Sequence, residues 1–580
     1  MPKLMLHRFL AVPALLLSLL MTVAVAAPAH AAERTTQTEA RRVDRVKTPK
    51  LVWVKAADGS GYSASVKLPR DYDRPSSGSG SVTIALFKVP AATPSRRIGT
   101  LFLNPGGPGG SGVEIAKAAT GFLSRSVLDR FDIVGFDPRG TNSSSRLRCF
   151  ASASRQTTAL SGMDAAFPIT GSQEKGFIAA GKKLASGCSG YGATMASSMS
   201  TAEVARDLDV LRRAVGDKLL TYLGFSYGSY LGEVYANLFP DRFRALVIDG
   251  VLNPVAYAGT RASRSVPTTL RIKSAEASWK ALTEGLAACA KAGPRYCPLS
   301  SPQADFDRVA NTLKLHGSVV VDTDDDDVRY SYGDFISDVL NALYYPDGMD
   351  WVAHVVAVLK TATTSSDAHS VATATTRLGT LVKAFHRVTG VDGEDDSYDN
   401  SLEAYSGVLC TDSLHASDPH TWIAANKKAA ATAPHFSGIW GWSDVQCATN
   451  YWKAKDEDAY RGTFSKRTVA PVLIVGNYHD PATNYSGAVE TKALMPQSYL
   501  IRSNSWGHTA YGTSDCVTHQ VDAYLLSGAR PGGGECVGKV KPFSSPLTTM
   551  SMNRAGGLSR ILPSRDGLPP VTVPVEPETP

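Results

Sequence analysis

Three residues of the types that cooperate in acyl transfer follow one another along the 580-residue chain in the order serine, aspartate, histidine. Ser226 is the centre of the pentapeptide Gly224-Phe225-Ser226-Tyr227-Gly228, and Asp480 and His508 come much later. A serine hydroxyl is a weak nucleophile at neutral pH, so it needs a base, and the base needs an acid that orients it. The pattern therefore predicts covalent catalysis with Ser226 as nucleophile, His508 as base and Asp480 as orienting acid.

The segments around Ser226 are typical of a strand followed by a helix. The apolar run at 219–223 predicts a buried strand, and apolar residues then recur at helical spacing until Pro240. Gly224 and Gly228 allow a tight turn that lifts the serine hydroxyl clear of a sheet. A purely structural turn is the alternative interpretation.

The acid and the base also stand where strands end. Asp480 follows a predicted strand at 471–475, and His508 follows another at 498–501. His479 precedes the last strand and is therefore a poorer candidate for the base. Asp249, at the end of an earlier strand, is the second candidate for the acid.

A glycine-rich segment at 104–112 is expected to supply backbone donors for the oxyanion of a tetrahedral intermediate. We assign one donor to the Gly107 amide and the other to the Tyr227 amide. The same segment matches a G-x-G-x-x-G dinucleotide fingerprint. Export of the protein argues against a nicotinamide cofactor, and Pro108 removes an amide that a phosphate could use, so we expect no cofactor.

Alternating strand and helix patterns predict parallel β-α-β units. A helix at 200–216 is indicated by a capping box of Ser200 and Glu203 and by a terminal Gly216. The predicted buried strands are residues 101–103, 131–136, 219–223, 245–248, 471–475 and 498–501.

The long gap between the fourth and fifth of these strands is too long for a loop and must fold as an insertion. Its patterns are helical at 275–290, 332–343 and 351–359, and extended at 318–321. We therefore expect an α/β protein with the α/β-hydrolase fold: a mostly parallel sheet flanked by helices, with a large, mainly helical cap inserted between strands 6 and 7.

The N-terminus is typical of a secretory signal peptide. Lys3 and Arg8 precede an apolar run at 9–27 and a small-residue exit ending at Ala31. A membrane anchor is the alternative, because the run approaches spanning length. We expect a secreted protein without stable membrane association.

The expected divisions are a signal peptide at 1–31, a pro-segment or N-terminal arm at 32–49, the first part of the hydrolase core at 50–254, the cap at 255–405, the second part of the core at 406–540 and a C-terminal tail at 541–580.

Charge and cysteine content narrow the function further. Loss of residues 1–31 would take the formal net charge from +7 to +5, a scattered excess that indicates no nucleic-acid partner. Eight cysteines in an exported chain suggest four disulfides, and no cysteine stands in a spacing typical of a metal site, so we expect no metal. The expected pairs of neighbours are Cys149 with Cys188, Cys289 with Cys297, Cys410 with Cys447 and Cys516 with Cys536.

Several linked motifs resemble those of the secreted tripeptidyl aminopeptidases of actinobacteria, which belong with the proline-iminopeptidase-like serine peptidases of the α/β-hydrolase fold. The similarity extends from about residue 50 to residue 540. Two departures, an asparagine before the Pro105 segment and Asn253-Pro254 where Asp-Pro is usual, do not touch the three catalytic candidates. The motifs are residues 104–112, 136–140, 223–228, 249–251 and the segment from Asp480 to His508.

The resemblance implies an exopeptidase that releases short peptides, such as tripeptides, from free N-termini. Such an enzyme must pair the substrate ammonium with an acid and block longer chains, a task suited to the cap. Asp412 is our candidate for that acid, with a solvated or capping aspartate as the alternative. The aspartates at 324–327 are interpreted as an exposed turn.

Two other functions remain open at this point. An esterase or lipase could use the same residues, and an inactive hydrolase scaffold could serve for binding. The sequence does not indicate the oligomeric state.

Overall fold

The computed structural model describes residues 32–75, 80–322, 327–389 and 398–547. The expected signal peptide at 1–31, the aspartates at 324–326 and the tail from residue 548 lie outside this part of the chain.

The centre of the molecule is a ten-stranded sheet with the order β1-β2-β3-β5-β4-β6-β7-β10-β11-β12. From β5 to β12 all neighbouring strands are parallel, while β1, β2, β3 and β5 pair antiparallel. The strands are β1 (Val54–Lys55), β2 (Tyr62–Pro69), β3 (Ser81–Val89), β4 (Gly99–Asn104), β5 (Phe131–Phe136), β6 (Leu220–Phe225), β7 (Phe243–Asp249), β10 (Val472–His479), β11 (Ser498–Trp506) and β12 (Glu535–Val537).

Helices cover both faces of the sheet, because successive strand residues point to opposite sides. Leu246 and Ile474 belong to the apolar core that contains α7 and α8, whereas Val247 and Leu473 belong to the core that contains α2 and α20. The helices outside the insertion are α1 (Gln37–Asp44), α2 (Gly112–Phe122), α3 (Arg125–Arg130), α4 (Ala153–Leu160), α5 (Gly171–Ser189), α6 (Ala193–Ala196), α7 (Thr201–Ala214), α8 (Tyr227–Leu238), α19 (Tyr485–Leu494) and α20 (Asp515–Ser527).

Helix α7 begins as expected at Ser200, whose hydroxyl accepts the Glu203 amide at 3.2 Å. The expected reciprocal bond of a capping box is absent at this helix. The Glu203 carboxylate instead accepts hydrogen bonds from Arg139 at 2.8 Å and Arg206 at 2.6 Å. A buried ion pair therefore replaces the second half of the capping box.

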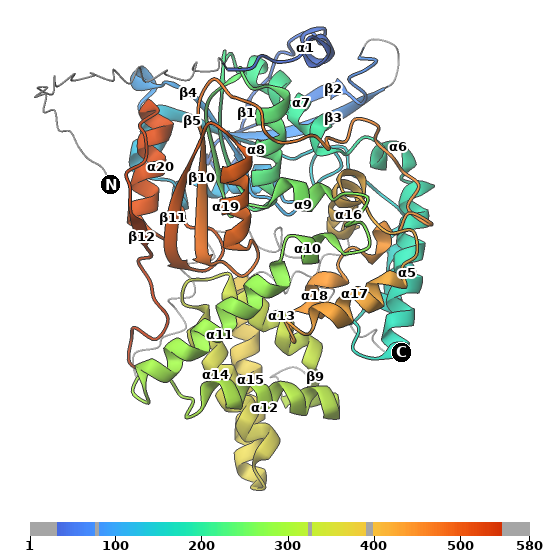
Figure 1. Ribbon diagram of the computed structural model, residues 1–580, viewed down its shortest axis with the longest axis vertical. Helices are drawn as coiled ribbons and strands as arrows, with labels where there is room; N and C mark the ends of the chain where they lie inside the picture. Colours follow the sequence, from blue (N-terminus) through green and yellow to red (C-terminus); the bar gives the residue numbers. More distant parts are fainter. Residues whose placement is uncertain (1–31, 76–79, 323–326, 390–397, 548–580) are drawn as a thin grey trace, which may run out of the picture.

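Between β7 and β10 the chain forms a helical cap with a β-hairpin, and Figure 1 shows α11 to α15 below one end of the sheet. This insertion follows the sixth strand of the main sheet when the two-residue strand β1 is not counted. It has an apolar core of its own, in which Leu282, Phe306, Phe335 and Val352 are fully buried. Its elements are α9 (Pro254–Ala258), α10 (Thr268–Arg271), α11 (Ser274–Ala292), α12 (Pro302–His316), β8 (Ser318–Asp322), β9 (Asp327–Ser331), α13 (Tyr332–Leu343), α14 (Gly348–Thr364), α15 (Ala368–Thr389), α16 (Ser401–Asp412), α17 (Thr421–Ala429) and α18 (Ser437–Gly441).

The segment before residue 50 packs onto the hydrolase core. The Glu39 carboxylate accepts hydrogen bonds from Arg206 of α7 at 2.9 and 3.0 Å, and Val43 is fully buried in the main core. Residues of α1 are thus part of the folded body.

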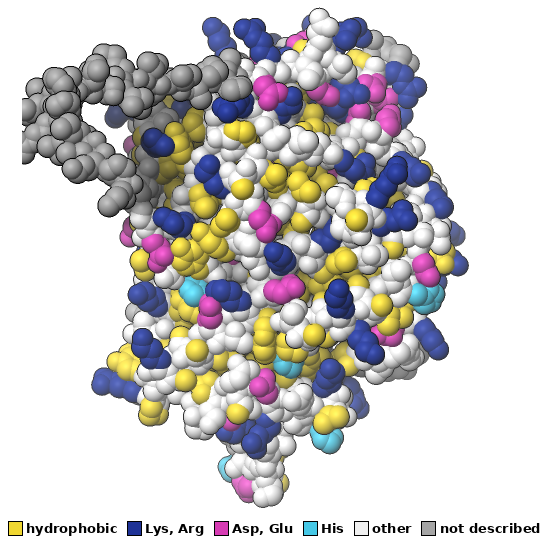
Figure 2. All heavy atoms as spheres, viewed as in Figure 1, with side chains coloured by type: hydrophobic (Ala, Val, Ile, Leu, Met, Phe, Trp, Pro, Cys, Tyr) yellow, Lys and Arg dark blue, Asp and Glu magenta, His cyan; other side chains and the backbone are white. Residues whose placement is uncertain are grey.

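Four disulfides join the pairs of neighbours expected from the sequence: Cys149–Cys188, Cys289–Cys297, Cys410–Cys447 and Cys516–Cys536. Among the helices that the structure describes, none combines the length and the apolar character that a membrane crossing requires. On the face drawn in Figure 2, basic and acidic side chains are interspersed.

Candidate active site

Ser226 lies at the sharp turn between β6 and α8, with φ 56° and ψ −124°. This conformation is rare for a residue with a side chain. The turn leaves no room for side chains at its two glycines: a Cβ on Gly224 would lie 2.3 Å from the Gly228 carbonyl oxygen, and one on Gly228 would lie 2.8 Å from the Asn104 carbonyl oxygen. Close packing of the turn thus explains both glycines of the pentapeptide.

The glycine-rich segment after β4 lies directly against this turn. A Cβ on Gly106 would lie 2.5 Å from the Phe225 carbonyl oxygen and 2.9 Å from the Ser226 Cβ, and both Gly106 and Gly107 have positive φ. Gly107, Ser226 and Tyr227 line the same cavity. The two backbone amides assigned to the oxyanion therefore belong to segments that meet at the serine.

Asp480 and His508 form a buried pair at the ends of β10 and β11. The His508 Nδ1 lies 2.9 Å from each carboxylate oxygen of Asp480. The carboxylate also accepts the amides of Ala482 at 2.9 Å, Thr483 at 2.8 Å and Thr509 at 3.0 Å. Burial opposes ionisation of Asp480, but His508 and these amides outweigh it and lower the pKa of the carboxyl.

The second ring nitrogen of His508, Nε2, is buried and has no hydrogen-bond partner within the described part of the chain. Because Nδ1 donates its proton to Asp480, Nε2 carries the free lone pair. The ring contacts the end of β7, since a Cβ on Gly250 would lie 3.1 Å from the His508 Cε1.

Asp249 connects the serine turn with the histidine loop. Its carbonyl oxygen accepts the Ser226 amide at 2.9 Å, and its carboxylate accepts the amides of Ala510 at 3.0 and 3.1 Å and of Tyr511 at 2.7 Å. Burial, partly offset by those amides, raises the pKa of Asp249 to about 6. The second candidate for the acid therefore holds the backbone of the two segments together, whereas Asp480 contacts the imidazole.

Asn477 is a buried site residue that sequence reasoning missed. Its Nδ2 donates to the carbonyl oxygens of Gly507 at 2.7 Å and Thr509 at 3.3 Å, and its Oδ1 accepts the Ser505 amide at 3.0 Å. Asn477 thus holds the backbone on both sides of His508. A polar residue inside an otherwise apolar strand was the available signal.

The cavity at Ser226 has a volume of about 40 Å³, and residues of the cap form part of its wall. Helix α16 forms one wall, and it also contacts the glycine-rich segment: a Cβ on Gly109 would lie 3.2 Å from the Tyr405 amide nitrogen. The lining residues carry no charge; they are Gly107, Pro108, Ser226, Tyr227, Leu252, Tyr257, Thr268, Thr269, Ile272, Ser274, Tyr405, Leu409, Trp440, Ala482 and Thr483.

Asp412 lies outside this lining. It is buried, and its carboxylate accepts hydrogen bonds from the Thr201 amide at 2.9 Å and the Thr201 hydroxyl at 2.5 Å, while that hydroxyl also contacts the Tyr227 hydroxyl. Burial raises the pKa of Asp412 to about 7, against the opposing effect of Thr201. This geometry fits the capping alternative at the start of α7, so we do not propose Asp412 as the ligand of a substrate ammonium.

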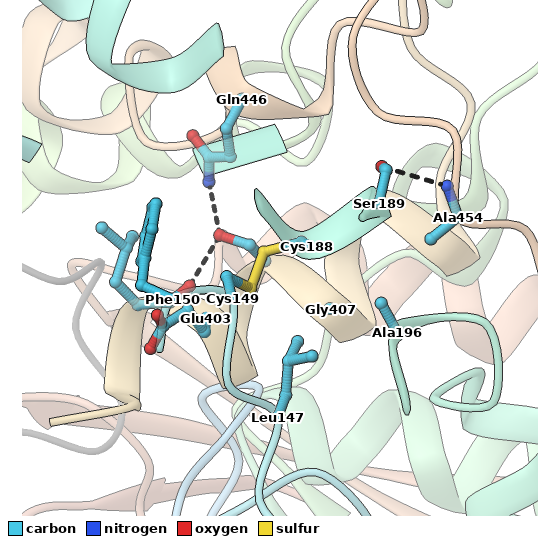
Figure 3. The surroundings of a disulfide bond; sticks show 12 residues. Leu147, Cys149, Phe150, Cys188, Ser189, Ala196, Glu403, Gly407, Gln446 and Ala454 are labelled. Carbon is cyan, nitrogen blue, oxygen red and sulfur yellow. Dashed lines mark hydrogen bonds between the residues drawn. A yellow bond between two sulfur atoms is a disulfide. The ribbon is translucent and has the colours of Figure 1, made fainter. Parts of the chain in front are cut away.

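The start of α16 is held near the disulfide between Cys149 and Cys188, as Figure 3 shows for Glu403 and Gly407. Tyr398 donates from its hydroxyl to Glu403, and the same oxygen accepts the Cys149 amide at 3.2 Å. Burial, opposed by the Tyr398 hydrogen bond, raises the pKa of Glu403 to about 8. The cavity wall is therefore anchored through a buried carboxyl group.

Within the described residues, no group of three or more histidine, cysteine, aspartate or glutamate side chains is arranged to hold a metal ion. All eight cysteines are consumed by the disulfides.

Two family models match the chain where these elements lie. A model described as "alpha/beta hydrolase fold" matches residues 99–267, which include Ser226, and one described as "TAP-like protein" matches residues 433–536, which include Asp480 and His508. The fold and the serine turn thus define an α/β-hydrolase.

Curated relatives resolve the family further. The chain is 30% identical over 482 residues to the tripeptidyl aminopeptidase of Streptomyces lividans, covering 80% of this chain and 81% of that protein. It is 29% identical over 492 residues to the serine protease Hip1 of Mycobacterium tuberculosis (82% and 87% covered), and 30% identical over 478 residues to carboxylesterase B of the same species (81% and 84% covered). The chain belongs to the tripeptidyl aminopeptidase-like peptidase family of the α/β-hydrolases, and it is a serine hydrolase of the peptidase type.

Proposed function

We propose that the protein is a secreted exopeptidase that releases short peptides, in particular tripeptides, from free N-termini through an acyl-enzyme at Ser226. The observation that supports this proposal most strongly is the buried Asp480–His508 pair, whose second imidazole nitrogen, Nε2, has no hydrogen-bond partner among the described residues. The four disulfides agree with export, since such bonds persist in oxidising compartments.

In the proposed reaction the Ser226 hydroxyl transfers its proton to the His508 Nε2 as its oxygen attacks the scissile carbonyl carbon. The carbonyl oxygen becomes an oxyanion that the amides of Gly107 and Tyr227 stabilise. His508 then protonates the leaving amine, and the acyl-enzyme is hydrolysed by water with His508 again as base. Asp480 keeps the imidazole in the required tautomer and stabilises the imidazolium.

The cap supports release of short peptides. Its helices α10, α16 and α18 supply part of the wall of the cavity beside Ser226, and that wall carries no charged side chain. An extended tripeptide spans roughly 10 Å, so its ammonium would lie beyond the uncharged lining. We assign no acid to that ammonium.

An esterase is the second candidate, because a relative of equal identity is named carboxylesterase B. Peptides of graded length, each with a free or an acetylated N-terminus, distinguish the candidates when they are compared with p-nitrophenyl esters and with Ser226→Ala as control. We expect tripeptide release from free N-termini and at least 100-fold lower kcat/KM after acetylation. Equal cleavage of acetylated peptides would rule out the exopeptidase, and hydrolysis of esters alone would favour the esterase.

A further inference from the structure

His479 is the last residue of β10 and directly precedes Asp480 in the chain. It pairs in register with Trp506 of β11, two residues before His508. The His479 and Trp506 rings stack with 4.0 Å between centroids and an interplanar angle of 3°. One stacked pair thus joins the strand ends from which the acid and the base project.

Both ring nitrogens of His479 face oxygen acceptors. Nδ1 lies 2.7 Å from a carboxylate oxygen of Glu284 on cap helix α11, and Nε2 lies 2.9 Å from the Asn504 Oδ1. The Asn504 amide is oriented by Glu535 of β12, which accepts its Nδ2 at 3.0 Å. Its oxygen must therefore point at His479.

Two acceptors require two donors, so both contacts form together only when both ring nitrogens carry a proton. Three charged groups lie around the ring: the Glu284 carboxylate and the Lys280 ammonium on α11, and the Glu535 carboxylate behind Asn504. The Lys280 ammonium bonds the same Glu284 oxygen at 2.7 Å and the Tyr478 carbonyl oxygen at 3.0 Å.

Helix α11 contacts both chain neighbours of Asp480, His479 and Pro481. Glu284 holds His479, and the Ser278 hydroxyl donates to the Pro481 carbonyl oxygen at 2.5 Å. Ser278 in turn accepts the indole N–H of Trp440 at 2.8 Å, and Trp440 lines the cavity. The cap is thereby connected to the residues on either side of the acid.

We infer that His479, held between Glu284 and Asn504 on the Trp506 ring, is a positioning residue that couples cap helix α11 to the Asp480–His508 pair. It acts through the backbone of β10 and β11, and this role rests on the proposed function of that pair. Catalytic groups lose much of their effect when displaced by about 1 Å, so loss of the coupling lowers turnover while substrate affinity is kept.

Two substitutions separate hydrogen bonding from shape. His479→Phe keeps a ring on Trp506 but removes both polar contacts, whereas His479→Arg keeps a flat group with donors for both acceptors. Turnover is measured per active site, counted by fluorophosphonate titration, so that a folding defect does not lower kcat. His420→Phe is the matched control, because His420 also bonds an aspartate, Asp418, at 2.7 Å but is largely exposed.

We expect His479→Phe to lower kcat at least tenfold with KM within about twofold, and His479→Arg to restore kcat to within about threefold of the original. Glu284→Gln, on the cap surface, should lower kcat in the same direction and add nothing to His479→Phe in the double variant. The inference would be overturned if the Phe variant had the same kcat as the original, or if the Arg variant had the same lowered kcat as the Phe variant.

A second readout does not depend on peptide cleavage. The His508 Nδ1 proton, shared with Asp480, is followed by NMR of ring-labelled protein. It should be observed in the original and the Arg variant and be broadened or shifted in the Phe variant. An unchanged signal in all three would contradict coupling between His479 and the pair, even if the protein proved to cleave esters only.

Discussion

The backbone carbonyl oxygen of Tyr344 in the cap accepts a hydrogen bond from the His508 amide at 3.0 Å, and the Tyr344 ring packs edge-on against the imidazole with 4.9 Å between centroids. Gly507 permits this approach, since a Cβ there would lie 2.8 Å from the same carbonyl oxygen. The cap is therefore part of the support of the histidine as well as a cover for the cavity.

Tyr344→Ala tests this support. Removing a buried aromatic ring beside the imidazole leaves a cavity that costs about 3–5 kcal/mol of stability and allows the ring of His508 to move. We expect kcat to fall roughly tenfold or more, with a lower melting temperature. An unchanged kcat per active site in the alanine variant would show that the cap contributes nothing to the histidine geometry.

Gly106→Ala tests the contact between the glycine-rich segment and the serine turn. The new Cβ would meet the Phe225 carbonyl oxygen at 2.5 Å, so the segment must shift and carry the Gly107 amide with it. Loss of an oxyanion donor costs about 100- to 1000-fold in kcat. Gly216→Ala is the control, because Gly216 also has a positive φ, 90°, so the backbone strain is similar. Nothing lies within 4 Å of the new Cβ at this position, so no segment has to shift. Similar kcat values for the two variants would contradict the assignment.

Glu403 should make stability depend on pH. Burial raises its pKa to about 8 from 4.5, so the fold favours the protonated form and loses stability as pH rises through this interval, by up to about 5 kcal/mol. Glu403→Gln stays neutral and should melt higher than the original at pH 8 to 9 and about equally near pH 4. Melting curves across this range, with exposed Glu457→Gln as control, check the sign. If the melting temperatures of all three proteins changed with pH in the same way, the raised pKa of the Glu403 carboxyl would be refuted.

Deletion of residues 32–46 tests whether the N-terminal arm belongs to the mature folded protein. Deleting them removes the buried Val43 and the two Glu39 contacts to Arg206. Removing one partner of a buried ion pair costs about 3–5 kcal/mol, so the melting temperature should fall clearly. Glu39→Gln should cause part of the same loss. A truncated protein that melts like the original would instead favour a removable pro-segment.

The strands before Ser226 and Asp480 were predictable because buried parallel strands begin as apolar runs. Only the first part of β11 was predicted, at 498–501, because its second half, up to Trp506, is polar and partly exposed. The antiparallel strands β2 and β3 were missed, since buried residues alternate there with half-buried or exposed ones and no continuous apolar run marks either strand. Glu203 forms only half of a capping box because two arginines bind its carboxylate. Arg139 is distant in the sequence, and Arg206 lies one helical turn further along α7.

The residues of the candidate site also fall into two groups, those that the sequence could identify and those that it could not. The pentapeptide and the strand-end acid and base follow local patterns, so their segments could be identified. The role of Asp412 could not be deduced, because only the fold buries it against Thr201. The contributions of Asn477 and Tyr344 depend on contacts across the sheet edge and across the insertion, which spacing along the chain does not encode.

The most direct test of the central claim is covalent labelling with a fluorophosphonate, followed by peptide mapping. The account predicts stoichiometric modification of Ser226 in the original protein, none in Ser226→Ala, and labelling slowed by about four orders of magnitude in Asp480→Asn, where an amide no longer holds the histidine tautomer. Modification of a different residue, or a folded protein whose Ser226 stays unlabelled, would contradict it.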